Sequence, residues 1–267
     1  MIVLTNNYYY YAITFTMQAL TMLKKLLCTP FLLVGLTSPV NATIVEFQTS
    51  LGAIQVNLFD QTTPETVANF LQYIDEHHYT NSVIHRVSSN FVVQGGGYSF
   101  EGDWPLTRIE TNPTVTNEPV YSNVKGTIAM AKLSNQPDSA TDQWFFNLTD
   151  NASNLDVQNG GFTVFGQVIG DGMTVVEKIA NLALCQDVPM TDYSTQNCID
   201  QSTPGIENFI VINQIDIVDS SKVTDADITP VKNTLNTPDD ENSSGGSFTW
   251  FTLLGLFSIS IRKLIIK

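Results

Sequence analysis

The sequence predicts a mainly β fold, an antiparallel barrel whose open ends are covered by two helices. Short stretches of alternating apolar and polar residues recur over residues 43–218, turn residues separate them closely, and only two stretches have helical spacing. The resulting order of strands, helix, strands, helix and strand is typical of such a barrel. It lacks the regular strand–helix alternation of a parallel nucleotide-binding sheet.

The first predicted element is a β-hairpin over residues 43–58, with the sequence TIVEFQTSLGAIQVNL. Apolar and polar residues alternate on both sides of Ser50–Gly52, which supplies the turn. A helix follows, with Thr63 as its N-cap and Pro64 at its first position. It has one apolar face and ends near His77 and His78, which are expected to be a solvated helix end.

Two short strands come next, over residues 83–87 and 91–94, joined by the turn Ser88–Asn90. A polar loop follows over residues 101–117. Three further strands are predicted at 126–131, 144–147 and 163–168. The remaining elements are a helix over 173–183, a long loop over 184–208 and a strong closing strand over 209–218.

Both ends of the chain differ from its middle. Residues 1–42 are predicted to be a leader and secretory signal peptide, since Lys24 and Lys25 precede the apolar run 26–36 and small residues precede Thr43. An N-terminal membrane anchor is the alternative. Residues 219–247 have the composition of a disordered acidic linker, and 248–267 are predicted to be a hydrophobic anchor or sorting segment with a basic end.

Charge excludes one class of partner. All 26 acidic residues, but only seven of the twelve basic ones, lie between Glu46 and Glu241. Such a surface repels nucleic acid, because it lacks the cations that displace phosphate counterions. A P-loop reading of the glycines at 95–97 fails as well, because the lysine and the spacing are absent, so we expect a turn or a close backbone approach there.

Cysteine usage agrees with export. Cys28 lies in the predicted signal peptide, which leaves Cys185 and Cys198. Two cysteines in an oxidising compartment usually pair, and two free thiols are the alternative. The three histidines do not have ligand spacing, so the sequence predicts no metal site and no cofactor.

The stretch Ile84–Gly97, IHRVSSNFVVQGGG, carries the most chemical information. If it folds as strand–turn–strand, Arg86 and Gln94 share a face, with Phe91 and Val92 beside them. One cation, one amide and apolar walls suit the holding and polarising of an uncharged planar group such as a peptide bond. They do not suit hydrolysis, since no activated nucleophile lies in the stretch.

With four further motifs, this stretch resembles the cyclophilin family of peptidyl-prolyl cis–trans isomerases, in its bacterial exported branch. The resemblance covers about residues 43–218 and rests on IHRV at 84–87, FVVQGG at 91–96, GTIAMA at 126–131, QWFFN at 143–147 and VFG at 164–166. It implies a closed eight-stranded antiparallel β-barrel with two capping α-helices. It also implies a monomer that acts on proline-containing peptides and unfolded exported proteins.

The resemblance also assigns roles. Arg86 is the catalytic cation, assisted by Gln94 and Phe91. The residues that bind substrate are the apolar Val92, Phe145, Leu155 and Phe162, together with Gln143 and the backbone near Ala131 and Lys132. Plain core packing and a surface salt bridge are the structural alternatives for the apolar residues and for Arg86. Two residues depart from the family pattern. Asn154 replaces an aromatic residue that contributes to cyclosporin binding in the family, which predicts weak binding of cyclosporin, and Phe162 keeps the pocket but removes a polar contact.

Three functions are candidates for a chain with these residues. The first is an exported isomerase that acts on X-Pro bonds. The second is a module that binds proline-containing segments as a chaperone or surface protein, with incidental catalysis. The third, a purely structural surface protein, does not explain the arginine.

The C-terminal segment has a resemblance of its own. Ser244–Lys267 contains Gly245–Gly246, an apolar run and a basic end, in the order of the GlyGly-type sorting signals of some Gram-negative bacteria. In that class the apolar segment is cut by a rhomboid-type protease during export to the cell surface. A permanent inner-membrane anchor is the alternative, and both imply transient or permanent association with a membrane.

Overall fold

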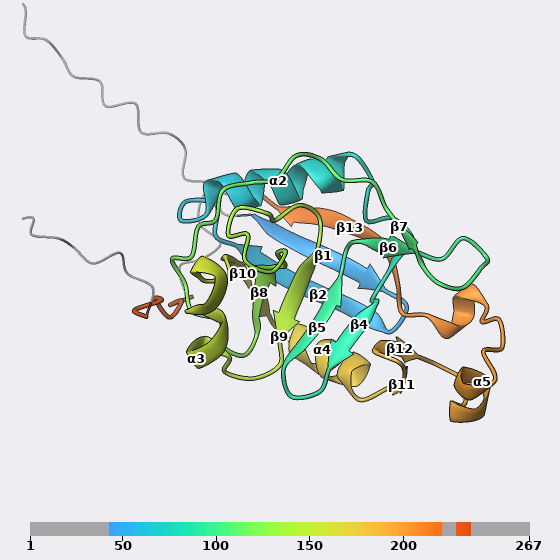
Figure 1. The fold of residues 1–267 in the computed structure, drawn as a ribbon. Coiled ribbons are helices and arrows are strands. Elements are labelled where there is room, and N and C mark those ends of the chain that lie inside the picture. Colours follow the sequence, from blue (N-terminus) through green and yellow to red (C-terminus); the bar gives the residue numbers. More distant parts are fainter. Residues whose placement is uncertain (1–42, 221–227, 236–267) are drawn as a thin grey trace, which may run out of the picture. The chain divides into compact units, whose positions relative to one another are not determined.

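The computed structural model describes residues 43–220 and 228–235 of the chain. Most of its strands form one curled antiparallel sheet with the order β4-β5-β9-β8-β10-β2-β1-β13-β3-β6-β7, and β11 pairs with β12 separately (Figure 1). The strands are β1 Ile44–Thr49, β2 Gly52–Leu58, β3 Ser82–Val83, β4 Arg86–Ser88, β5 Val92–Gly95, β6 Tyr98–Ser99, β7 Thr107–Arg108, β8 Thr127–Met130, β9 Trp144–Asn147, β10 Val164–Ile169, β11 Ala183–Cys185, β12 Val188–Met190 and β13 Val211–Asp219.

Two longer helices lie where the spacing predicted them, and two short ones were not expected. The α-helices are α2 Pro64–Asp75, α3 Ala152–Leu155, α4 Gly172–Ala180 and α5 Thr195–Ile199, with 3-10 turns η1 Gln158–Gly160 and η2 Ile206–Asn208. The mainly β class is confirmed. The closed eight-stranded barrel is not confirmed, because the strands form a row of eleven.

The break between β3 and β4 matters for the site. Residues 82–88 form one extended run that changes partner part-way along. The amide of Ile84 donates to the carbonyl of Ile210 at 2.9 Å, on the β13 side, whereas that of His85 donates to Gln94 at 3.2 Å, on the β5 side. This change of partner places Arg86 at the start of β4, on the outermost strand of its end of the sheet.

The N-terminus of α2 differs in detail from the prediction. Thr63 occupies the N-cap position, but its hydroxyl donates to the carbonyl of Phe59 instead of capping the helix. The carboxylate of Glu118 accepts hydrogen bonds from the amides of Glu65 and Thr66 at 3.3 and 2.9 Å. A negative charge at this end of the helix is favourable, because it meets unpaired amides and the positive end of the helix dipole.

The histidines after α2 are also not equivalent. His77 is exposed, as predicted, but the side chain of His78 is only 7% exposed. Its Nε2 lies 3.3 Å from a carboxylate oxygen of the buried Asp142 and 3.2 Å from the carbonyl oxygen of Gly96. The expectation of a solvated helix end is therefore wrong for His78, because α2 ends against the β5–β6 connection.

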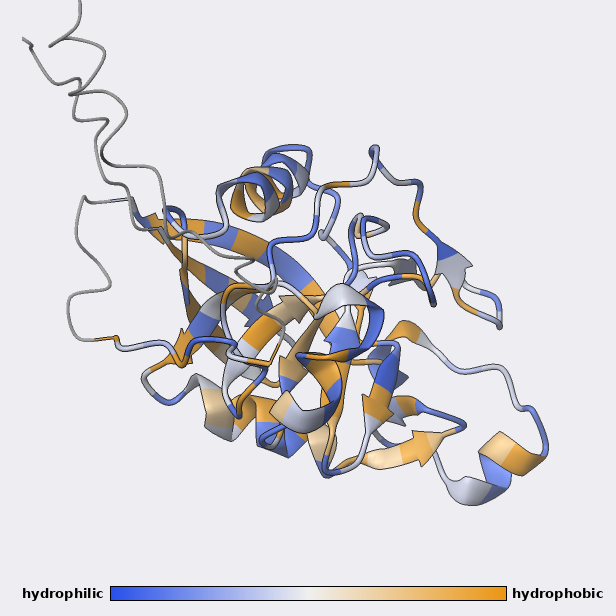
Figure 2. Ribbon diagram, turned by 60° about the vertical axis from the view of Figure 1, so that its left-hand side comes forward, coloured by the Kyte–Doolittle hydropathy of each residue, from blue (hydrophilic) through white to orange (hydrophobic). Residues whose placement is uncertain are grey.

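The main core fills the inner face of the sheet under α2 and α4. Its largest fully buried side chains are aromatic, and Trp144 and Phe47 meet edge to face with their ring centroids 4.9 Å apart. Figure 2 shows hydrophobic and hydrophilic residues alternating along the strands and around α2, as half-buried elements require.

The predicted loop 184–208 contains more structure than its sequence indicated. β11 and β12 form a small hairpin, α5 follows, and Cys185 and Cys198 are joined by a disulfide with a Cα–Cα distance of 5.5 Å. The amide of Val87 in β4 donates to the carbonyl of Asp187 at 2.7 Å. The hairpin therefore lies against the outermost strand that carries Arg86.

Several predictions concern residues outside the described part of the chain. The signal peptide (1–42), most of the linker (219–247) and the C-terminal segment (248–267) lie there. Within the linker, residues 228–235 are described, and Lys232 forms an antiparallel bridge with Tyr121. Across residues 43–220 and 228–235, no helix is both long and apolar enough to cross a membrane.

Candidate active site

Strand register places the predicted site residues in one row. Arg86 in β4 is paired with Gln94 in β5, Gln94 with Phe145 in β9, and Phe145 with Ala129 in β8. Directly paired residues on neighbouring strands have their side chains on the same face of the sheet. A cation, an amide, an aromatic ring and a methyl group therefore follow one another across four strands.

The next row faces the other way. Val87, Val93, Phe146 and Ile128 are paired in the same manner one residue along, and all belong to the main core. Because side chains alternate between the two faces of a strand, burial of this row fixes the first row on the opposite face. A slip of one residue would exchange the rows and bury Arg86.

A chain of hydrogen bonds fixes the polar end of the site row. Arg86 Nη1 donates to Gln94 Oε1 at 3.3 Å, and Gln94 Nε2 donates to Gln143 Oε1 at 2.9 Å. The Gln94 amide therefore accepts on one side and donates on the other, which fixes its orientation, and the Gln143 amide is oriented as an acceptor. Arg86 is half-buried and has further guanidinium donors besides the one directed at Gln94.

The predicted pocket residues gather in a second apolar cluster, separate from the main core. Phe145 and Phe162 meet edge to face with a centroid distance of 5.9 Å. Val92, Phe145 and Leu155 are at most 4% exposed. The cluster consists of Phe59, Phe91, Val92, Tyr121, Ala129, Ala131, Phe145, Leu155, Phe162, Val164 and Ile228.

A hollow of about 250 Å³ adjoins the amide chain. Four predicted site residues, Gln94, Ala131, Lys132 and Gln143, line it, together with Arg108. Arg108 is not among the predicted site residues, because it lies in the stretch 101–117, which is predicted to be a polar loop. Its guanidinium is 3.6 Å from the carboxylate of the buried Asp142 and 5.8 Å from the ring of Tyr98.

Lys132 stabilises the turn at residues 159–161, beside this hollow. Its ammonium donates to the carbonyls of Asn159 and Gly161 at 2.9 and 2.6 Å and lies 4.8 Å from the centroid of Phe162. Burial lowers the pKa of Lys132 to about 8, and the nearby carboxylate of Asp138 opposes that shift only in part. The side chain therefore binds the turn before Phe162, while its backbone remains the part predicted to meet substrate.

A second hollow, of about 290 Å³, is lined by Arg86 and by the hairpin of β11 and β12, here called the cystine hairpin because it contains Cys185 of the disulfide. Its walls come from two segments, the loop with Trp104 and Leu106 and the hairpin turn with Gln186 and Asp187. The predictions from the sequence do not include this surface. The apolar residues of the loop are spaced irregularly among polar ones, so no period indicated that they pack together.

His85 lines the same hollow. Its ring packs on Tyr98 with a centroid distance of 4.7 Å. Burial lowers the pKa of His85 to about 4, against an opposing effect of Asp142. The imidazole is therefore neutral at physiological pH and is not a proton donor at the site.

This shift predicts how stability depends on pH. Between pH 6.5 and 4 the unfolded chain binds a proton at His85 that the folded chain does not, so the free energy of unfolding decreases by about 3 kcal/mol as the pH falls through this range. Replacing His85 with Gln removes this loss. Urea unfolding at pH 4.5 and 7 checks it: the decrease on acidification should be smaller in the variant, and equal decreases would contradict the assignment.

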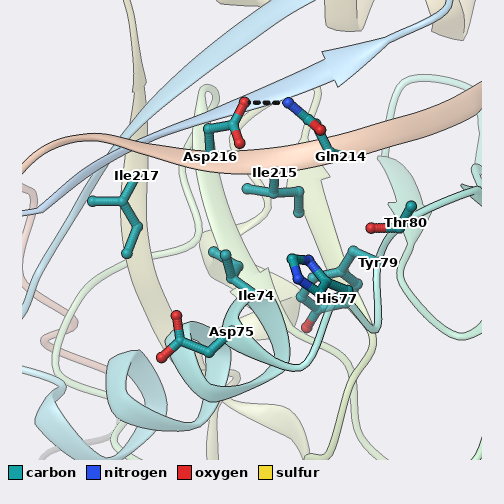
Figure 3. Close-up of a pocket in the computed structure, with 9 residues that line it drawn as sticks. All are labelled: Ile74, Asp75, His77, Tyr79, Thr80, Gln214, Ile215, Asp216 and Ile217. Carbon is teal, nitrogen blue, oxygen red and sulfur yellow. Dashed lines mark hydrogen bonds between the residues drawn. The ribbon is translucent and has the colours of Figure 1, made fainter.

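A third hollow lies between the end of α2 and β13 (Figure 3). It has a volume of about 250 Å³, and Ile74, Ile215 and Ile217 form its apolar side. Two of its polar side chains pair with each other, since Gln214 Nε2 donates to Asp216 at 2.7 Å. No residue of the predicted site lines it. Among the described residues, no group of three or more His, Cys, Asp or Glu side chains could hold a metal ion.

Fold and site together define a class. A curled antiparallel sheet holds one arginine and two amides beside an apolar cluster, and one hollow is lined by Gln94 and another by Arg86. These groups can bind an extended, uncharged chain and direct one cation at it, as in enzymes that act on peptide bonds without covalent chemistry.

Comparison with known proteins identifies the family. The profile described as "Cyclophilin type peptidyl-prolyl cis-trans isomerase/CLD" matches residues 44–199, so the chain belongs to the cyclophilin-type peptidyl-prolyl cis–trans isomerases. It is 36% identical over 181 residues to the peptidyl-prolyl cis-trans isomerase of Acinetobacter baylyi, covering 67% of this chain and 89% of that one.

Two further relatives are also named as peptidyl-prolyl cis-trans isomerases. Peptidyl-prolyl cis-trans isomerase B of Escherichia coli is 39% identical over 160 residues, which cover 56% of this chain and 94% of the relative. Peptidyl-prolyl cis-trans isomerase A of Dickeya dadantii is 41% identical over 157 residues, which cover 55% of this chain and 79% of the relative. The chain is thus an isomerase by family, and the roles of its individual residues remain predictions.

Proposed function

We propose that the protein accelerates the cis–trans isomerisation of X-Pro bonds in exported proteins, with Arg86 as the catalytic cation. The observation that carries this proposal is the row Arg86–Gln94–Phe145, held in register across three strands next to the apolar cluster. The row supplies a donor, an acceptor and a ring at consecutive positions, as a twisted proline imide requires.

The physics of the reaction explains these residue types. Rotation about a peptide bond meets a barrier of about 18–20 kcal/mol, because the nitrogen lone pair is delocalised into the carbonyl. In the twisted form that delocalisation is lost and the nitrogen becomes a hydrogen-bond acceptor. A guanidinium that donates to this nitrogen stabilises the transition state more than either ground state, and this difference is what lowers a barrier.

Arginine suits this role better than the other basic residues. Its guanidinium is charged at any working pH, and its donors form a rigid fork. One of them is committed to Gln94, which orients the group, and others are available to the substrate. We assign Gln94 this bracing role together with a contact to the substrate carbonyl.

The apolar cluster is proposed to take the proline ring. Phe91, Val92, Phe145, Leu155 and Phe162 surround the place where the ring would lie. Tight apolar walls hold the ring still while the preceding carbonyl turns, so rotation is concentrated in one bond.

The polar hollow is proposed to bind the chain that flanks the proline. Gln143 and the backbone at Ala131 and Lys132 line it, and they offer the donors and acceptors that an extended peptide needs. The substrate is therefore an unfolded or extended segment, and nothing in this arrangement depends on a cofactor.

The expected location is outside the cytoplasm, with a monomeric domain that associates transiently or permanently with a membrane through residues 248–267. The signal-peptide pattern and the apolar C-terminal run support this proposal. The mass of the mature protein purified from its native host tests both ends: loss of residues 1–42 is expected, and a mass that retains them would contradict export by signal cleavage.

The activity itself is tested with a short proline peptide in a protease-coupled assay, in which only the trans form is cleaved. We expect wild-type protein to abolish the slow cis phase, which otherwise lasts tens to hundreds of seconds. A chain that binds the peptide without shortening this phase would be a proline-binding module instead, and the proposal would fail.

A further inference from the structure

Residues 228–235, which lie beyond the family-matched region 44–199, form an isolated β-bridge with the loop before β8. The amide of Ser122 donates to the carbonyl of Val231 at 2.8 Å, and the amide of Asn233 donates to the carbonyl of Val120 at 2.9 Å. Between them Tyr121 and Lys232 form an antiparallel bridge. Figure 1 shows this segment, here called the strap, on the same side as α3.

Asn233 is the strap's one well-buried residue. It is 8% exposed, whereas Val231 in the same segment is 55% exposed. Its side-chain Nδ2 donates to the backbone carbonyl of Asp156 at 3.2 Å. Asp156 directly follows α3 and Leu155, one of the predicted walls of the proline pocket.

Asp156 connects this contact to the pocket. Its carboxylate accepts from the amide and the side chain of Asn123 at 2.8 and 2.9 Å and from the hydroxyl of Ser122. Asn123 Nδ2 also donates to the carbonyl of Phe162 at 3.0 Å, and the amide of Phe162 donates to the carbonyl of Leu155 at 2.9 Å. The loop, α3 and both apolar walls therefore form one hydrogen-bonded unit.

A second contact reaches the pocket through apolar packing. Ile228, at the start of the strap, belongs to the same cluster as Phe145, Leu155 and Phe162. The strap thus contacts the pocket at two points: a side-chain hydrogen bond at Asn233 and an apolar contact at Ile228.

From these contacts we propose that Asn233 is a positioning residue of the isomerase site, fixing Asp156 and thereby Leu155 and Phe162 around the bound proline. The inference rests on the proposed function. Because the contact acts on the wall that holds the ring and not on the guanidinium, its loss weakens substrate binding equally in the ground and transition states.

The test uses full-length protein and a proline tetrapeptide, with kcat and KM measured separately. Asn233→Ala is expected to raise KM about fivefold and to leave kcat within twofold, as for the loss of one hydrogen bond. Asn233→Asp keeps the shape but loses the donor and places a charge beside Asp156, so KM should rise at least as much. Val231→Ala, in the same strap but exposed, is the matched control and should behave as wild type.

Ile228→Ser provides an independent variant if Asn233 substitutions lower the folded fraction, which far-UV circular dichroism reports at the assay temperature. It should raise KM in the same way. With an active wild type, an unchanged KM in folded Asn233→Asp would overturn the inference, as would a fall in kcat alone. If the Asn233 variants do not fold, an unchanged KM in Ile228→Ser would overturn it. An inactive wild type would instead refute the proposed function.

Discussion

Arg86→Ala should lower kcat/KM for a proline peptide by about 100- to 1,000-fold, the effect of removing one preorganised donor from a developing charge. The reason lies in the site row, where Arg86 is the cation paired directly with Gln94 and next but one to Phe145. Neither the amide of Gln94 nor the ring of Phe145 can donate to the imide nitrogen a hydrogen bond as strong as that of the charged guanidinium.

Arg86→Lys separates charge from geometry. Lysine keeps the cation but lacks the fork that donates to Gln94 and to substrate at the same time. We expect activity between that of wild type and Arg86→Ala. A lysine variant as active as wild type would mean that a point charge near the bond is sufficient.

Binding and stability provide the controls for both variants. Arg86 is half-buried and projects from the face opposite the main core, so the free energy of unfolding should change by less than about 1 kcal/mol. Affinity for the peptide, measured by titration, should change far less than kcat. A wild-type rate in Arg86→Ala would remove the arginine from the mechanism.

Local patterns predicted the elements that carry this site, because strand alternation is visible in the sequence. The hairpin of β1 and β2, the position of β9 and the shared face of Arg86 and Gln94 all follow from a period of two. The start of α2 followed equally well from Thr63 and Pro64.

Contacts between distant residues could not be predicted in this way. The N-terminus of α2 is capped by the carboxylate of Glu118, which lies more than fifty residues further along the sequence than the amides of Glu65 and Thr66. The strap lies within the predicted linker 219–247. Its attachment depends on backbone hydrogen bonds and on one asparagine, and neither produces a periodic pattern of hydrophobic residues in the sequence. The cystine hairpin has strands of three residues each, too short to show an alternation.

The three glycines at 95–97 were expected to mark a turn or a close backbone approach, and the close approach is what the structure contains. A Cβ at Gly95 would lie 2.8 Å from the ring of Trp144, one at Gly96 would lie 2.6 Å from the carbonyl oxygen of Asp142, and one at Gly97 would lie 2.6 Å from the side chain of Gln143. The glycines therefore let the start of β9 approach β5, which brings Gln143 to Gln94.

Gly96→Ala should destabilise the protein severely. Gly96 has φ +96°, a backbone angle that residues with a side chain rarely adopt. The added methyl would also meet the backbone oxygen of Asp142, which can move only if the chain around it moves. Strain and overpacking together cost about 3 kcal/mol or more, which lowers the melting temperature by roughly 10 °C in a domain of this size. Thermal unfolding followed by circular dichroism measures it.

Gly97→Ala is the matched variant that separates stability from function. The three atoms nearest to its methyl would all belong to the side chain of Gln143, which is flexible and can rotate away, so the melting temperature should stay within a few degrees of wild type. The displaced amide can then no longer accept from Gln94, and kcat/KM should fall about tenfold. If Gly97→Ala retained full activity, the bond between the two glutamines would have no part in catalysis, and the glycines would serve packing alone.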